Sequence, residues 1–149
     1  MPAASETPLE LPRTWRPLGT RIAISVCGVM LLTLSAAAWF LLADDIRAAF
    51  SWYQRITIIA FVLAAGALGW AFVRCRVTAT EEHLVVVNGY RHHEYEWAQV
   101  VAARMPQGAP WVTLDLADGT TRAALGIQAS DGSRATAALR DLRRLIDRS

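Results

Sequence analysis

The chain has 149 residues, of which 54% are hydrophobic and 19% charged, and its formal net charge at pH 7 is +2. This apolar excess favours a membrane protein, and the small, evenly spread charge excludes the basic stripe of a nucleic-acid-binding protein. All fifteen basic residues are Arg and none is Lys, whose codons are AT-rich, so we expect a bacterial source with a GC-rich genome. The two cysteines, Cys27 and Cys75, are isolated, so we expect free thiols and no disulfide framework.

The first segment, residues 1–20, contains four Pro among scattered polar residues. This composition is typical of chains that cannot bury enough apolar surface to fold. We therefore expect a disordered cytoplasmic tail.

Two uncharged runs follow, from Ile22 to Ala43 and from Ile56 to Val73. As helices they would be roughly 33 and 27 Å long, close to the hydrocarbon thickness of about 30 Å. We therefore predict transmembrane helices over 21–43 and 56–73. A buried core helix is the alternative for the second run, but its apolar residues surround the helix and do not form a stripe.

A signal peptide is the alternative for the first run, with cleavage at the small residues SAAA removing residues 1–38. The apolar run continues past that site through Trp39 and Leu42, which favours a membrane span. No ionisable residue lies inside either run, so a transport or proton-relay role has no residue to carry it.

The distribution of Arg predicts the orientation of the two spans. Five Arg flank the outer ends of the runs: Arg13, Arg16, Arg21, Arg74 and Arg76. Only Arg47 and Arg55 lie in the linker, residues 44–55. By the positive-inside rule both termini are cytoplasmic and the linker is external. Apolar residues at helical spacing in the linker predict a short amphipathic turn.

After Arg74 the hydrophobic period changes to two residues, which predicts a cytoplasmic domain of β-strands over residues 74–149. The pair Asn88-Gly89 is a strong hairpin signal, because both residues tolerate a positive φ. With this pair as the turn, one face of the hairpin is apolar and is expected to be buried: Leu84, Val86, Tyr95 and Trp97. The other face is polar: His83, His92, Glu94 and Glu96.

A second hairpin is predicted at Asp118-Gly119, where the register places Asp115 opposite Arg122 and apolar residues opposite each other on the other face, including Leu114 with Ala123. The end of the chain has helical spacing, with Ser133 as the expected N-cap. Its apolar residues form one stripe: Ala135, Ala138, Leu139, Leu142 and Ile146. The domain is therefore expected to have six short antiparallel strands closed by a C-terminal helix.

Three segments of this domain resemble the bacterial PH-like domain: RVTATEEHLVVVNG, YEWAQVVAARM and LDLADGTTRAAL. More narrowly, the chain is similar to the small actinobacterial membrane proteins grouped as the low-molecular-weight protein antigen 6, PH-domain family, in which two spans commonly precede the domain. The resemblance covers residues 74–146. It implies a seven-stranded fold, whereas the sequence shows six strands clearly and GIQAS as a vestigial seventh.

The expected fold class is thus a membrane α-helical hairpin of two spans, followed by a small α+β PH-like domain with antiparallel sheets capped by a C-terminal helix. Eukaryotic PH domains hold inositol phosphates with basic residues around the loop after their first strand. Here that loop is Thr80-Glu81-Glu82, whose carboxylates would repel a phosphate. Arg74 and Arg76 are expected to anchor at anionic lipid headgroups.

One cluster has metal-ligating residue types, because the predicted hairpin places His83 opposite Glu94 with His92 on the diagonal. Two His and a carboxylate can hold a divalent cation, but a solvated polar face is the favoured interpretation, and no metal or other cofactor is expected. The sequence has no nucleophile motif and no glycine-rich phosphate loop. We therefore expect no catalytic residues, no small-molecule substrate and no enzyme activity.

Two functions remain open. The favoured one is a non-catalytic integral membrane protein of the bacterial cell membrane, which displays a PH-like domain at the cytoplasmic face and binds a protein or peptide, through an exposed strand edge. The alternative is a membrane-surface sensor of a metal ion or of anionic lipid headgroups. The expected partners are the lipid bilayer and a protein. The sequence leaves the identity of the partner, the pathway and the oligomeric state open.

Overall fold

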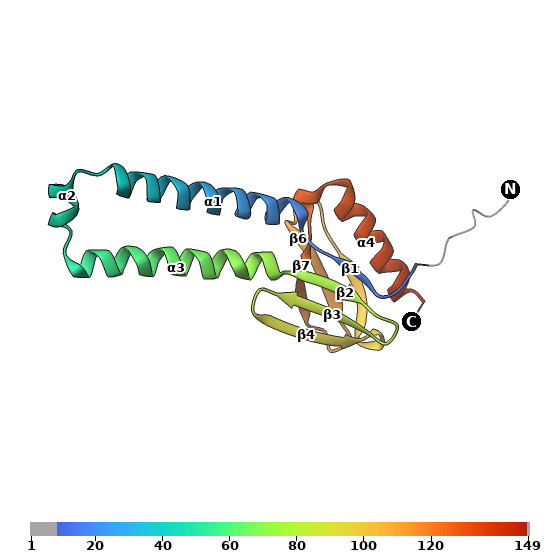
Figure 1. The fold of residues 1–149 in the computed structure, drawn as a ribbon. Coiled ribbons are helices and arrows are strands. Elements are labelled where there is room, and N and C mark those ends of the chain that lie inside the picture. The colour runs from blue at the N-terminus through green and yellow to red at the C-terminus, as the bar shows by residue number, and fades with distance from the viewer. Residues whose placement is uncertain (1–8, 149) are drawn as a thin grey trace. The chain divides into compact units, whose positions relative to one another are not determined.

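A computed structural model describes residues 9–148, which separate into two compact units (Figure 1). The first unit combines the residues up to Pro17 with those from Cys75 onward, and the second unit is Leu18–Arg74. The chain therefore starts the first unit, forms the whole of the second and then returns to complete the first.

The second unit is a helical hairpin whose long helices are α1 (Leu18–Leu41) and α3 (Trp52–Arg74). At about 1.5 Å per residue each is roughly 35 Å long. Both are long and apolar enough to cross a membrane, with mean hydropathies of 2.1 and 2.3, and neither has a buried residue. The helices predicted at 21–43 and 56–73 are thus present and extend a few residues beyond three of those bounds.

The linker contains the short helix α2 (Asp44–Ala49), as its apolar spacing predicted. Arg55 donates from Nη2 to the Arg47 carbonyl at 2.7 Å and from Nε to the Phe50 carbonyl at 3.3 Å. These bonds satisfy carbonyl groups at the C-terminal end of α2.

Residues 13–15 form strand β1 (Arg13–Trp15), so the prediction of a disordered tail is wrong for this segment. Residues 1–8 of that predicted tail lie outside the described residues. β1 pairs antiparallel with β2 (Arg76–Ala79), and the hydroxyl oxygens of the paired Thr14 and Thr78 are 3.0 Å apart. A segment that precedes the helical hairpin therefore completes a sheet formed after it.

Packing explains why this N-terminal segment is ordered. Three of its apolar side chains pack against the hydrophobic core: Leu9, Leu11 and Trp15. In addition, Arg13 forms an ion pair of 3.0 Å with Asp141. Burial of the apolar side chains offsets the conformational entropy that is lost when the segment is fixed.

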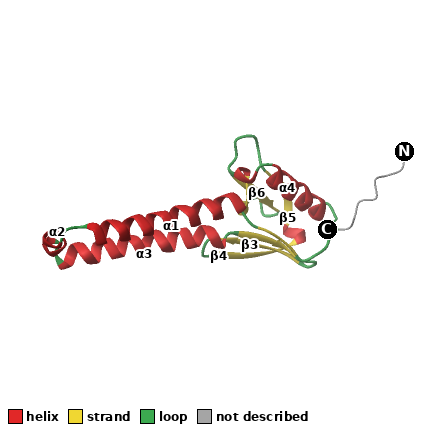
Figure 2. Ribbon diagram, turned by 45° about the horizontal axis from the view of Figure 1, so that its top comes forward, coloured by secondary structure: helices red, strands yellow, loops and turns green. Residues whose placement is uncertain are grey.

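The described part of the first unit contains seven strands in two antiparallel sheets, together with helix α4 (Figure 2). The first sheet has the order β1-β2-β3-β4 and includes β3 (His83–Asn88) and β4 (Arg91–Glu96). The second has the order β5-β6-β7, with β5 (Val100–Arg104), β6 (Trp111–Leu116) and β7 (Thr121–Gln128). The seventh strand is thus β1. GIQAS is not a separate strand, because its first three residues continue β7 and its last two begin the 3₁₀ turn η2 (Ala129–Asp131).

Helix α4 (Ser133–Ile146) covers the core with the stripe that its spacing predicted. Its buried residues are Ala135, Ala138, Leu139, Leu142 and Leu145, and Ile146 is partly buried against them. The predicted N-cap is wrong, because Ser133 is the first residue of the helix. The N-cap position is Gly132, which has a φ of 56° and no side chain to offer.

The β3–β4 hairpin keeps the predicted faces but shifts its register by two residues. The turn is Gly89-Tyr90, flanked by the pair Asn88 and Arg91, and Gly89 has a φ of 63°. A positive φ at the first turn residue alone is typical of a type II′ turn. Because the shift is even, Leu84 and Val86 remain in the core, both almost fully buried.

The register of the β6–β7 hairpin differs from the predicted register by one residue. Asp115 lies opposite Thr121, not Arg122, because Gly119, with a φ of 82°, allows a three-residue turn. An odd shift exchanges the faces of a strand, and on β7 it is Ala124 that is fully buried. Asp115 instead forms an ion pair of 2.5 Å with Arg104 of β5.

Two residues hold the sheets together where β7 crosses the first sheet. Asn88 donates from Nδ2 to the Ala123 carbonyl at 2.5 Å and accepts from the Leu125 N–H at 3.0 Å. Gly126 lies directly on β2, where an added Cβ would be 2.5 Å from the backbone carbonyl carbon of Arg76. The crossing therefore requires a glycine at 126, and Asn88 bonds both sheets.

Candidate interaction surface

The outer edge of β4 is one of the two open edges of the first sheet among the described residues, and the outer edge of β1 is the other. β4 ends the first sheet, and β3 is the only element with which it makes extensive contacts. The edge of β5 is partly covered, because Arg143 of α4 donates from Nε to the Ala103 carbonyl at 2.9 Å. β7 lies against β2 and β3. The surface defined by the outer edge of Arg91–Glu96 is named the β4 edge below.

The hairpin geometry determines which backbone groups face this edge. Asn88 and Arg91 flank a two-residue turn, so they form a hydrogen-bonded pair, and such pairs alternate along the ladder. The N–H and C=O groups of His92, Glu94 and Glu96 therefore point away from β3. The Glu96 N–H is already bonded to Gln99 Oε1 at 3.0 Å, which leaves the backbone of the other two to define the β4 edge.

The side chains on the solvent face of β4 form a polar row. His92 Nε2 lies 3.1 Å from Glu94 Oε1, and both side chains are more than half exposed. On the opposite face the His93 and Tyr95 rings stack with centroids 6.1 Å apart. Burial raises the pKa of Tyr95 above 10.0, while the charge of Arg122 lowers it and that of Asp118 raises it further. The surface offers backbone hydrogen bonds and side chains of both charges.

The predicted metal-ligating trio does not come together. His83 is opposite Glu96, not Glu94, and its Nδ1 lies 4.0 Å from Glu82 Oε2. Only His92 and Glu94 are adjacent, and no group of three metal-ligating side chains occurs among residues 9–148. The error has a simple cause, since the two-residue shift of the hairpin moves Glu94 away from His83.

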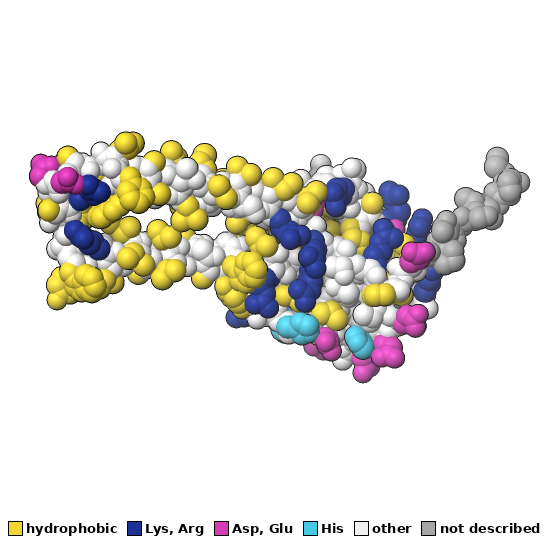
Figure 3. Space-filling view, in the orientation of Figure 1, with side chains coloured by type: hydrophobic (Ala, Val, Ile, Leu, Met, Phe, Trp, Pro, Cys, Tyr) yellow, Lys and Arg dark blue, Asp and Glu magenta, His cyan; other side chains and the backbone are white. Residues whose placement is uncertain are grey.

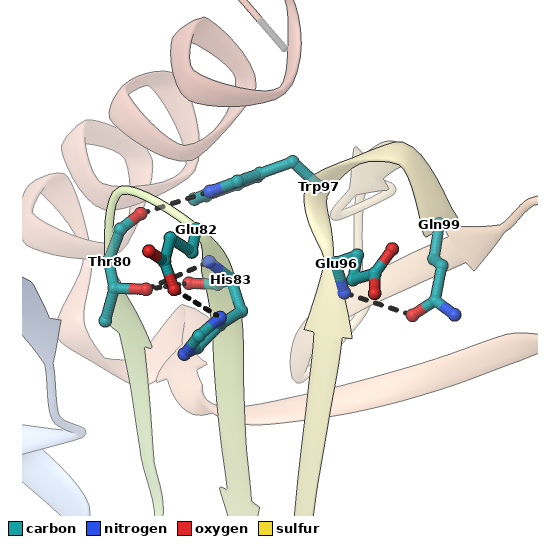
Figure 4. Close-up of polar contacts among 6 residues, drawn as sticks. All are labelled: Thr80, Glu82, His83, Glu96, Trp97 and Gln99. Carbon is teal, nitrogen blue, oxygen red and sulfur yellow. Dashed lines mark hydrogen bonds and ion pairs between the residues drawn. The ribbon is translucent and has the colours of Figure 1, made fainter.

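The loop Thr80–Glu82, which was expected to follow the first strand like the lipid loop of eukaryotic PH domains, follows β2 instead. It is closed by its own hydrogen bonds (Figure 4). Thr80 Oγ1 donates to the His83 carbonyl at 2.8 Å and accepts from the His83 N–H at 2.9 Å. Glu81 and Glu82 are left exposed beside an open pocket of about 310 Å³ that Leu11 also lines. Its exposed carboxylates disfavour a phosphate ligand.

Trp97 packs beside this loop, but it does not lie in a strand as the sequence predicted. It is the first residue of a 3₁₀ turn, η1 (Trp97–Gln99), instead of the last residue of a strand, and it is half-buried against the core. Its Nε1–H donates to the Thr80 carbonyl at 3.1 Å. Glu96 and Gln99 form a reciprocal capping box around η1 (Figure 4).

The two arginines predicted to anchor at lipid headgroups flank Cys75, where the chain passes from α3 to β2. Arg74 is the last residue of α3 and is exposed, and Arg76 is the first residue of β2 and is half-buried. The sequence reasoning missed Arg143 as a cover for β5. One Arg among several in a helix gives no signal for such a contact.

The fold defines the class of protein: a seven-stranded antiparallel sandwich closed by a C-terminal helix, in a chain that also contains a hairpin of two long apolar helices. Residues 74–145 match the family model described as the bacterial PH domain, and the chain belongs to this family. The resemblance inferred from the sequence is thereby confirmed.

The relatives of this chain include uncharacterised proteins of Mycobacterium tuberculosis and Mycobacterium bovis. Each is 30% identical over 121 residues, which is 81% of this chain and 72% of the relative. Because this match is longer than the segment after Arg74, it includes part of the helical hairpin. No solved structure shows a significant match.

Proposed function

We propose that this protein is a non-catalytic, multi-pass protein of the bacterial cell membrane whose PH domain binds a protein or peptide partner at the cytoplasmic face. The observation that carries the proposal is the unpaired β4 edge. An extended peptide adds to such an edge through backbone hydrogen bonds, and the alternating side chains of the strand provide selectivity. The His92 and Glu94 side chains are exposed and can contact such a peptide.

The placement in the membrane is supported by the two long helices and by β1. The apolar side chains of α1 and α3 are exposed, and neither helix has a buried residue, whereas a core helix would be mostly buried. Because β1 pairs with β2, the segments before α1 and after α3 must lie on the same side of any membrane that these helices cross. Two spans satisfy this requirement. The excess of Arg outside the linker supports the assignment of that side to the cytoplasm.

The orientation is tested by reporter fusions to Ser149 and to a site in the linker after Asp45. We expect cytoplasmic fluorescence from the first and alkaline phosphatase activity from the second. Phosphatase activity at Ser149 would reverse the assigned orientation.

The partner is tested by photo-crosslinking in the native host, with p-benzoylphenylalanine at His92 and, as the control, at Thr136 on the exposed side of α4. We expect an adduct of defined mass from position 92 that position 136 does not give. Glu94→Pro should abolish the adduct, because it removes an N–H that faces the edge without removing a bond to β3. Glu94→Ala, the matched control, should retain it. An adduct that survives Glu94→Pro would contradict binding at the β4 edge.

The sensor function has weaker support. His83 is separated from His92 and Glu94, so residues 9–148 do not bring the three predicted ligands together. For binding of anionic headgroups, Arg74 and Arg76 are suitably placed next to the end of α3. If added divalent metal raised the melting temperature of the full chain, the metal-sensor function would be favoured.

A further inference from the structure

The register of the first sheet defines two ends. Trp15 pairs with Val77, and Arg76 pairs with Val87 one residue before Asn88, so these residues lie at one end. At this same end the chain leaves toward α1 and returns from α3. The β3–β4 turn is therefore at the end of the domain from which both long helices continue.

This turn, defined here as the hairpin tip (Gly89–Arg91), has an aromatic and a basic side chain. Tyr90 is 60% exposed, and Arg91 is also exposed. The Gly89 N–H donates to Cys75 Sγ at 3.3 Å, which ties the hairpin tip to the residue that follows α3. The tip is thus held in place while its side chains face outward.

Charges along β2, β3 and β4 are separated between the two ends. The end with the hairpin tip carries Arg76 and Arg91, whereas the opposite end carries Glu81, Glu82 and Glu96. Figure 3 shows dark blue side chains gathered at one end of this sheet and magenta ones at the other. An anionic surface would therefore attract the tip and repel the loop at Thr80–Glu82.

We infer that the hairpin tip is a bilayer-contact site, in which Arg91 and Arg76 bind anionic headgroups and the Tyr90 ring inserts at the interface. Tyr is enriched at the membrane–water interface because its ring is apolar and its hydroxyl is polar. Arg pairs well with phosphate oxygens, and basic residues beside a span are attracted to anionic lipids. The inference rests on the proposed membrane placement of α1 and α3.

The test uses the full chain in nanodiscs of phosphatidylcholine with and without phosphatidylglycerol. A nitroxide is attached to Tyr90→Cys in a Cys27→Ser background, with Cys75 retained because it is 1% exposed. Collision with oxygen, which partitions into lipid, is compared with collision with an aqueous nickel chelate. The control label is at Glu82→Cys, at the opposite end of the sheet.

We expect phosphatidylglycerol to raise the oxygen-to-nickel collision ratio severalfold at position 90 and to leave position 82 aqueous. Arg91→Glu should abolish the increase, whereas Arg148→Glu, the same charge change at the exposed end of the chain, should not. A label at position 90 that stays as aqueous as position 82 would overturn the inference, as would an increase that survives Arg91→Glu. The wild-type chain labelled at Cys27 separates the two proposals, because an aqueous signal there would refute the membrane placement itself.

Discussion

The helical hairpin and the β-sandwich use the same apolar residue types in opposite ways. In the hairpin, Leu31 and Phe61 are 55% and 72% exposed, and no residue of α1 or α3 is buried. In the sandwich, Leu84 and Leu114 are fully buried. The sandwich excludes water by its own packing, whereas the hairpin exposes an apolar surface of the kind that marks a membrane or protein contact.

The free-energy cost of a substitution therefore depends on what surrounds the substituted side chain. In the sandwich, an added or removed atom meets close-packed neighbours of the same chain. In the helical hairpin, the same atom points away from the chain into the medium around the helices. Equivalent changes in the two regions should therefore give unequal effects. Because residues 13–15 belong to the sandwich, each variant must be measured in the full chain and not in the fragment 74–149.

The largest difference is expected for Gly→Ala. At Gly126 a Cβ would lie 2.5 Å from the backbone of β2, which cannot move without separating the strands, so we expect a loss of about 3 kcal/mol or more. At Gly66 in α3 a Cβ meets nothing within 4 Å, and Ala there should be neutral or slightly stabilising. Thermal unfolding of both variants in the same detergent measures the contrast. Equal stability of the two variants would show that β7 does not cross β2 at Gly126.

The next effect concerns Trp97 and its neighbour Glu96. Trp97→Ala removes a partly buried ring and the bond to the Thr80 carbonyl, so we expect about 3 kcal/mol, the lower end for an aromatic truncation. Glu96→Ala removes one side of the capping box around η1 and should cost about 1 kcal/mol. Chemical denaturation of both variants checks the order. The reverse order would place Trp97 outside the core.

A smaller loss is expected for Asn88→Ala. The substitution leaves the Ala123 carbonyl and the Leu125 N–H without their partner, at a cost of about 2 kcal/mol. Asn88→Asp keeps the acceptor but faces the Ala123 carbonyl with a carboxylate, and it should be no more stable than Asn88→Ala. If Asn88→Ala unfolds like the wild type, the bond between the sheets does not contribute to stability.

The smallest effect is a pH dependence at Tyr95. Burial raises the pKa of this phenol in the folded state, so the unfolded chain loses the proton first. The unfolding free energy should therefore decrease as the pH rises through about 10 and toward the folded-state pKa. Tyr95→Phe has no such proton, and its melting temperature should fall less between neutral and alkaline pH. Parallel pH profiles for the two chains would contradict this assignment.

Local patterns in the sequence predicted most elements of the fold. The two uncharged runs, the change to a period of two after Arg74 and the apolar stripe from Ala135 each depend on residues close in the chain. The turn at Gly89 was also predictable, although its partner Asn88 bonds β7 and does not occupy the turn. The register of the β6–β7 hairpin was not, because one extra residue in a glycine turn exchanges the faces of β7.

Contacts between distant segments could not be predicted. β1 has three residues, no measurable period and a partner more than sixty residues away, so nothing local distinguishes it from a tail. The candidate site has the same limitation. The sequence predicted a strand at Arg91–Glu96, but its position at the end of the sheet depends on the order of all the strands.

The segment before the helices completes the first sheet of the domain that follows them. Thr14→Cys and Thr78→Cys in a Cys27→Ser background test it directly, since these residues are paired and their hydroxyls touch. We predict that mild oxidation of native membranes links them within one chain. Cyanogen bromide, which cleaves after Met30 and Met105, then leaves fragments 2–30 and 31–105 joined until a reductant is added. The control pair, Thr14→Cys with Thr121→Cys, should not link. Absence of a link between positions 14 and 78, or a link only between two chains, would show that β1 does not pair with β2 of its own chain.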